Sequence, residues 1–220
     1  MRNTLDLFHR ITNELLDDEI QNSVSEFIPS DSLYQRMDLQ LGRKGISESE
    51  FEEVLKDLVL KTPKTASNAF FNQLFGGRNE TAVLGDLLSV ILNNSMYTYK
   101  AAGPQIGVEK TILREVCSII GWNDQADGTF APGGSMTNLM SVVMARDASN
   151  PDIRHNGAYK PMTVYTSNES HYSIPKNAAF AGIGKDNVRY VPSDDEGRMD
   201  PKQLERMVEE DLEKGLIPIM

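Results

Sequence analysis

The sequence has 220 residues, 40% of them hydrophobic and 25% charged, a composition typical of a globular protein rather than a disordered or fibrous one. The formal net charge of −10, from 32 acidic and 22 basic residues, argues against nucleic acid or an anionic membrane surface as a partner, because both attract basic faces. No stretch approaches the roughly 20 apolar residues of a membrane span, and the early acids Asp6 and Glu14 do not fit a secretory signal. We therefore expect a soluble, cytoplasmic protein.

Residues 1–65 have the pattern of a helical segment. Apolar residues recur at helical spacing from Leu5 to Phe27, and Pro29 closes that stretch. The range 30–41 predicts a second, short helix, and Ser47-Glu-Ser-Glu50 is a capping box that starts a third. Strand signals are few here and no catalytic constellation stands out, so we interpret this segment as structure for packing or assembly.

An aromatic loop breaks this helical pattern. Phe70-Phe-Asn-Gln-Leu-Phe75 places two amides among three phenylalanines, and Gly76 and Gly77 follow. Amides in aromatic surroundings can line a polar pocket, which makes Gln73 a candidate binding residue. The alternative is that both amides satisfy backbone groups of the loop.

Two strong helices are predicted next, over residues 81–96 and 108–120. Their wide apolar faces are typical of a protein core rather than of a ligand site. The second helix contains Cys117, the one cysteine, which cannot form an intrachain disulfide and is expected to be a reduced thiol in the core. One cysteine and three histidines give no recognisable metal-ligand cluster, so we expect no metal.

A glycine-rich turn followed by a helix occupies residues 128–146. The turn is Pro132-Gly-Gly-Ser135, and Ser135 is expected to open the helix. Paired glycines let backbone N–H groups converge, and a helix start adds unpaired N–H groups and the positive end of its dipole. Together these features suit a phosphate group, although an ordinary turn before an amphipathic helix has the same pattern.

The remaining sequence alternates between strands and helices. Strands are predicted at 162–167, 188–191 and 216–220, with helices at 176–182 and 200–214 between them. A β-α-β-α-β order predicts a parallel sheet with helices on its faces, and ligands of such sheets lie beyond the carboxyl ends of the strands. His171 follows the first strand and is therefore a candidate site residue. The alternative is a solvated surface histidine.

Three segments, in this order, carry a resemblance to a known family. They are Phe70 to Phe75, the stretch from Asp127 to Asn138 with the helix that ends in Ala145-Arg146, and the stretch from Thr166 to Ile174. The chain resembles a group II pyridoxal-phosphate-dependent amino-acid decarboxylase of the glutamate decarboxylase-like branch, over about residues 70–220. Ser67-Asn68 departs from the His-Pro that often precedes the aromatic loop in relatives.

The resemblance implies the α/β architecture of fold type I pyridoxal-phosphate enzymes and a homodimer with active sites near the subunit interface. Residues 66–220 would then be the first part of the large cofactor-binding domain, with an incomplete parallel sheet. The phosphate of pyridoxal 5'-phosphate would contact Gly133, Gly134 and Ser135. His171 would stack on the pyridine ring and take part in proton transfer. Gln73 would contact the carboxylate of a small amino-acid substrate.

The resemblance also implies residues that this sequence does not contain. The family needs a lysine that binds the cofactor, an aspartate at the pyridine nitrogen and a substrate-binding arginine, all further along the chain. We therefore expect this to be the N-terminal portion of a decarboxylase, inactive by itself. Glutamate, aspartate or cysteine sulfinate is the expected substrate of the whole protein. An aromatic amino-acid decarboxylase, another pyridoxal-phosphate lyase, and a non-catalytic short chain that binds a full-length partner are the alternatives.

Overall fold

The computed structural model describes residues 2–40, 42–72, 74–157 and 160–220, and these residues form two compact units. The first unit is Met1–Gly103 and the second is Pro104–Met220. The sequence predicted a division near residue 65, between a helical segment and a cofactor-binding domain. That division refers to the domains of the whole protein and stays a prediction. No helix in the described ranges is both long enough and apolar enough to cross a lipid bilayer.

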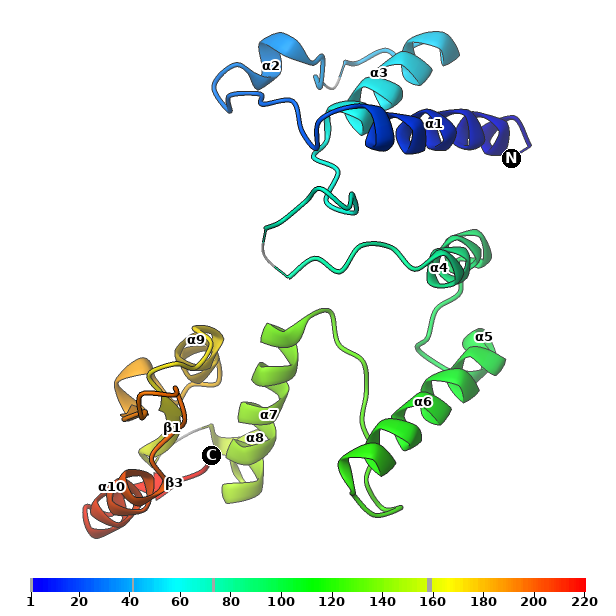
Figure 1. Cartoon of the computed structure of the whole chain (residues 1–220). Helices are drawn as coiled ribbons and strands as arrows, with labels where there is room; N and C mark the ends of the chain where they lie inside the picture. The colour runs from blue at the N-terminus through cyan, green and yellow to red at the C-terminus, as the bar shows by residue number, and fades with distance from the viewer. Residues whose placement is uncertain (1, 41, 73, 158–159) are drawn as a thin grey trace. The chain divides into compact units, whose positions relative to one another are not determined.

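The first unit is helical, as predicted. Its helices are α1 (Arg2–Gln21), α2 (Leu33–Arg36), α3 (Glu48–Lys61), α4 (Glu80–Leu92) and α5 (Tyr99–Ala102). The predicted capping box at the start of α3 is confirmed, since the Ser47 side chain accepts from the Glu50 amide and the Glu50 carboxylate accepts from the Ser47 amide. Helices α1 and α3 lie side by side (Figure 1) and are joined by the ion pairs Arg10–Glu52 and Lys56–Glu14.

Two helices of the first unit are shorter than their apolar patterns predict. Helix α1 ends at Gln21: the Asn22 amide still donates to the Asp18 carbonyl, but the Ser23 side chain then donates to the Ser25 carbonyl. Such local bonds compete with helix continuation. The helix predicted over 30–41 is reduced to the four residues of α2.

The second unit is an α/β arrangement. It contains helices α6 (Pro104–Ile120), α7 (Gly134–Ser149), α8 (Ile153–Asn156), α9 (Ser173–Phe180) and α10 (Pro201–Glu213), the 3-10 helix η1 (Lys185–Asn187), and strands β1 (Met162–Ser167), β2 (Val188–Val191) and β3 (Ile217–Pro218). The strands form one parallel sheet in the order β2-β1-β3. The predicted parallel sheet and the bounds of its first two strands are confirmed.

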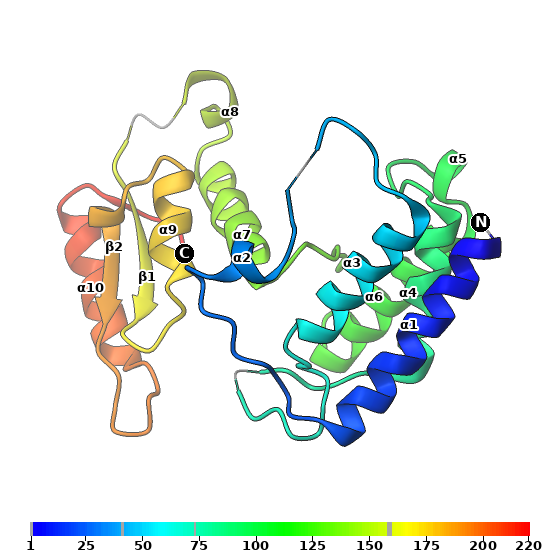
Figure 2. The same cartoon turned by 90° about the horizontal axis from the view of Figure 1, so that it is seen from above.

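The central strand β1 presents a different surface to each side of the sheet. Met162 and Val164 are buried in an apolar cluster with Val142 of α7 and Ala178 of α9. Tyr165, the next residue along the strand, instead donates a hydrogen bond to a carboxylate of α10. Successive strand residues point to opposite faces, so the sheet lies between α7 and α9 on one side and α10 on the other (Figure 2).

The face that contacts α10 contains a buried polar network. Asp211 of α10 is only 3% exposed. It accepts hydrogen bonds from Arg189 Nε on β2 at 2.9 Å and from Tyr165 Oη on β1 at 2.8 Å. The Tyr165 hydroxyl also contacts Thr163 Oγ1 at 3.0 Å. Both strands are thereby joined to α10, which fixes the helix against the sheet.

Candidate functional site

The predicted phosphate-binding turn lies at the amino end of α7. Gly133 is the N-cap residue, with φ +99° and ψ 157°, a conformation that residues with a side chain rarely adopt. The helix begins at Gly134, one residue before the predicted start at Ser135. Because the cap is a glycine, no side chain satisfies the first amides of this helix.

The open amides of this turn fit a phosphate group. The amides of Met136 and Thr137 both donate to the Gly133 carbonyl, at 3.0 and 3.3 Å. The amides of Gly134 and Ser135 and the Ser135 hydroxyl have no partner among the described residues. A side-chain methyl added at Gly133 or Gly134 would meet no atom of the rest of the described chain within 4 Å, so the surroundings of this turn are open on the side where the methyl would lie. Unpaired amides at a helix start attract anions.

The turn that carries His171 follows the carboxyl end of β1, as predicted. Its ring lies at the surface, with Nδ1 2.8 Å from Ser173 Oγ and 3.2 Å from the Ser173 amide nitrogen. The Tyr172 ring lies beside it, with centroids 4.2 Å apart and planes inclined by 34°. Lys176 Nζ lies 4.3 Å from the centroid of the Tyr172 ring. These contacts position an exposed ring, and the role of His171 at a cofactor stays a prediction.

Two side-chain amides join the His171 turn to the phosphate-binding turn. Asn138 Nδ2 of α7 donates to Ser173 Oγ of α9 at 2.9 Å. Asn177 Nδ2 of α9 donates to the Ser135 carbonyl at 2.9 Å, and this asparagine is 5% exposed. Both bonds link the amino-terminal part of α7 to α9, and hydrogen bonds of such half-buried and buried amides fix the packing of the two helices. These bonds bring the glycine turn and the His171 turn together as one candidate site.

Sequence reasoning missed Asn138, Ser173 and Asn177. All three lie within or beside the segments that carried the family resemblance. Their role depends on the packing of α7 against α9, which brings together residues 35 and 42 positions apart in the sequence. Ser173 and Asn177 are polar residues at helical spacing, but the charged Lys176 lies between them, so their spacing alone did not single them out. Their burial could not be read from the sequence.

The aromatic loop lies in the first unit. Phe70 and Phe75 stack edge to face, with ring centroids 5.5 Å apart and planes inclined by 79°, whereas Phe71 and Leu74 are exposed. Gln73 lies outside the described residues, so its predicted contact with substrate stays a prediction.

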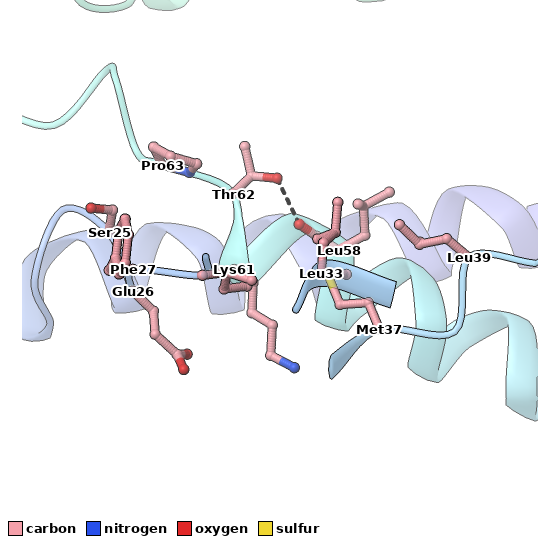
Figure 3. Close-up of a pocket in the computed structure, with 11 residues that line it drawn as sticks. Ser25, Glu26, Phe27, Leu33, Met37, Leu39, Leu58, Lys61, Thr62 and Pro63 are labelled. Carbon is pink, nitrogen blue, oxygen red and sulfur yellow. Dashed lines mark hydrogen bonds between the residues drawn. The ribbon is translucent and has the colours of Figure 1, made fainter. Parts of the chain in front are cut away.

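The first unit also contains an apolar hollow that is separate in sequence from the site on α7 and α9. It has a volume of about 370 Å³ and is shown in Figure 3. Phe27, Leu33, Met37, Leu39 and Leu58 supply much of its lining. The labelled polar groups bond locally: Thr62 Oγ1 donates to the Leu58 carbonyl, and Lys61 pairs with Asp57 at 2.7 Å. Such a lining lacks the convergent polar groups of a catalytic pocket.

The fold and the site define a protein with a parallel α/β core and a helix start suited to a phosphorylated ligand. A protein-family comparison makes this class specific: residues 33–220 match the pyridoxal-dependent decarboxylase conserved domain. The chain belongs to this family, whose cofactor is pyridoxal phosphate.

Curated relatives agree with the family match. The cysteine sulfinic acid decarboxylase of Mus musculus is 36% identical over 98% of the chain, and the match covers 44% of that relative. An acidic amino acid decarboxylase of Xenopus tropicalis is 33% identical over 98% of the chain and 43% of its own length. The chain therefore spans less than half the length of these relatives.

Solved structures confirm the fold. The crystal structure of mouse CSAD superposes with a TM-score of 0.91 at 34% identity, over 98% of this chain and 47% of that one. A tryptophan decarboxylase from Catharanthus roseus gives a TM-score of 0.84 at 20% identity, over the full length of this chain and 50% of its own, which supports the shared fold alone. The α/β, fold type I expectation is thus confirmed.

Proposed function

We propose that the whole protein is a pyridoxal-phosphate-dependent carboxy-lyase that releases the α-carboxylate of an acidic amino acid as CO₂. Cysteine sulfinate, aspartate and glutamate are the candidate substrates. The observation that carries the proposal is the direct connection between the open amino end of α7 and the His171 turn, through Asn138 and Ser173. The names of the relatives that are more than 30% identical support the acidic substrate class.

The phosphate of the cofactor would be held at the start of α7. The amides of Gly134 and Ser135 would donate to it, and the Ser135 hydroxyl would add a third donor. Gly133 makes this possible because its positive φ turns the chain into the helix without a side chain over the amides. Asn177 steadies the turn by donating to the Ser135 carbonyl.

His171 would contact the cofactor ring and move a proton at the reacting carbon. When bound, pyridoxal phosphate supplies an electron-accepting ring for the electron pair that departing CO₂ leaves behind. An imidazole is suited to proton transfer because one of its ring nitrogens can donate a proton while the other accepts one. Its contacts with Ser173 and Tyr172 restrict the ring before substrate arrives. Gln73 remains the proposed contact for a substrate carboxylate.

A decarboxylation assay of the whole protein tests the proposal. With added pyridoxal phosphate, CO₂ release is expected from at least one of the three acidic amino acids and not from aromatic ones. Release from tryptophan or tyrosine alone would refute the acidic substrate class, and no release from any amino acid would refute the activity.

Substitution of His171 tests whether the activity resides at this site. A positioned acid or base contributes about 10²–10⁴-fold, so His171→Asn is expected to lower kcat by at least about a hundredfold. His155→Asn is the matched control, because His155 is an exposed histidine of the short helix α8. Equal losses in both variants would contradict the assignment.

We further propose that the whole protein is a homodimer and that it serves amino-acid metabolism. Helix α4 exposes a series of large apolar side chains that such an interface would cover: Leu84, Leu87, Leu88, Val90, Ile91 and Leu92. Light scattering of the whole protein during size-exclusion chromatography is expected to give twice the chain mass. A mass equal to that of one chain would refute the dimer.

A further inference from the structure

We propose that Asn138 and Ser173 set the tautomer of His171, so that the neutral ring carries its proton on Nε2. The pair would act as positioning residues for the histidine. The tautomer assignment stands on the contacts alone, whereas its consequence for proton transfer rests on the proposed function.

The first argument is the environment of His171 Nδ1. This atom faces the Ser173 amide nitrogen at 3.2 Å and Ser173 Oγ at 2.8 Å. A backbone N–H can only donate, so the atom that receives it must present a lone pair. A ring protonated on Nδ1 would direct its hydrogen at the Ser173 amide hydrogen.

The second argument is the direction of the hydroxyl bond. Asn138 Nδ2 has hydrogens and no lone pair to offer, so its 2.9 Å contact makes Ser173 Oγ the acceptor. The hydroxyl hydrogen of Ser173 is then available for His171 Nδ1. The donors run in one direction, from Asn138 to Ser173 to His171, and chains of this kind strengthen one another.

Burial makes this chain effective. Ser173 is 2% exposed, so bulk water does not replace its contacts, and among the described residues its hydroxyl bonds to Asn138 and His171 alone. His171 Nε2, by contrast, has no hydrogen-bond partner among the described residues, and the ring lies at the surface. The chain therefore leaves an N–H on the outward nitrogen, available to donate to a bound substrate or cofactor.

The test replaces Asn138, the first donor of the chain, by a residue of the same size that can only accept hydrogen bonds. Asn138→Asp presents only acceptors at neutral pH, so it would draw the Ser173 hydroxyl hydrogen away from His171. The Oγ lone pair would then face Nδ1 and favour a proton there. Asn138→Leu is the matched control: it removes the amide donor without supplying an acceptor, so the hydroxyl can still donate to Nδ1.

Nitrogen NMR of histidine-labelled protein, without pyridoxal phosphate, reads the tautomer directly. Spectra are recorded at about pH 8, above the ordinary pKa of histidine. Comparison with His171→Asn identifies the signals of the His171 ring nitrogens. We expect unprotonated Nδ1 in the wild type and in Asn138→Leu, and a larger fraction of protonated Nδ1 in Asn138→Asp, where only the Ser173 amide still opposes that proton. His9 and His155 are internal controls whose signals should not change.

Two outcomes would overturn the inference. One is a wild-type His171 protonated on Nδ1. The other is identical His171 spectra in Asn138→Asp and Asn138→Leu, since a merely structural role would affect both alike. If circular dichroism shows that Asn138→Asp does not fold, Ser173→Ala is used in its place. Loss of the Ser173 hydroxyl should reduce the preference of His171 for the proton on Nε2. An unchanged preference in Ser173→Ala would also overturn the inference.

Turnover separates this inference from the proposed function. In an active enzyme, kcat of Asn138→Asp should fall at least tenfold below that of Asn138→Leu, with KM changed less than twofold. Equal kcat values would refute the positioning role. If the NMR result is as expected but the wild type decarboxylates no amino acid, the proposed function is refuted and the tautomer assignment stands.

Discussion

Removal of the Asp211 carboxylate is expected to destabilise the second unit strongly. Asp211→Ala deletes the acceptor of two hydrogen bonds from Arg189, at 2.9 and 3.3 Å, and of one from Tyr165, at 2.8 Å. Loss of one partner of a buried ion pair typically costs about 3–5 kcal/mol, because the other charge is left buried. The Arg189 side chain is 25% exposed, so water can reach part of the guanidinium. We therefore expect the lower limit, about 3 kcal/mol.

Urea unfolding followed by far-ultraviolet circular dichroism measures this loss. Asp211→Asn should cost less, about 1–2 kcal/mol, because its amide oxygen still accepts from Tyr165 while the charge is lost. Glu210→Gln on the same helix is the matched control: it weakens the exposed pair with Arg206 and should cost less than about 0.5 kcal/mol. A loss in Asp211→Ala no larger than in Glu210→Gln would refute the view that this network fixes α10 to the sheet.

Three further changes test other parts of the structure. Gly133→Ala should destabilise the protein by about 1–3 kcal/mol in urea unfolding, because φ is +99° there, and should weaken pyridoxal phosphate binding in equilibrium dialysis; unchanged binding would contradict the phosphate assignment. Val164→Ala should cost about 2–3 kcal/mol, from two lost methyl groups and a cavity at a site with no exposure; a cost below about 1 kcal/mol would mean that the cluster collapses around it. Burial alone would raise the pKa of Asp211, but hydrogen bonds from Arg189 and Tyr165 outweigh burial and lower it. The stability that Asp211 contributes should therefore be present above about pH 4 and be lost as the pH falls below that value; an unfolding midpoint with the same pH dependence in Asp211→Asn would contradict this.

Local chemistry made several elements predictable from the sequence. β1 and β2 have the predicted bounds because short β-rich runs there are enclosed by polar and turn residues. Helix α10 starts as predicted, since Asp200 accepts from the amides of Lys202 and Gln203 and Pro201 fills the first turn. The predicted starts of α7 and α9 were less accurate, because their first residues are fixed by contacts between the two helices rather than by local signals.

The same distinction between local signals and tertiary contacts applies to the candidate site. The position of the glycine turn before a helix and of His171 after a strand was predictable from local signals, whereas their roles toward a cofactor stay predictions. The partners of His171 were not predictable, since the Asn138–Ser173 bond joins residues 35 positions apart.

The sequence by itself determined which segments become strands, where a helix start is left open for an anion, and to which family the chain belongs. These properties depend on residue types at short spacing. Only the tertiary structure decided that α7 and α9 share one face of the sheet while Asp211 is buried with Arg189 and Tyr165 on the other. The glycine turn became one site with His171 because packing brought Asn138 to Ser173, a contact that no local pattern specifies.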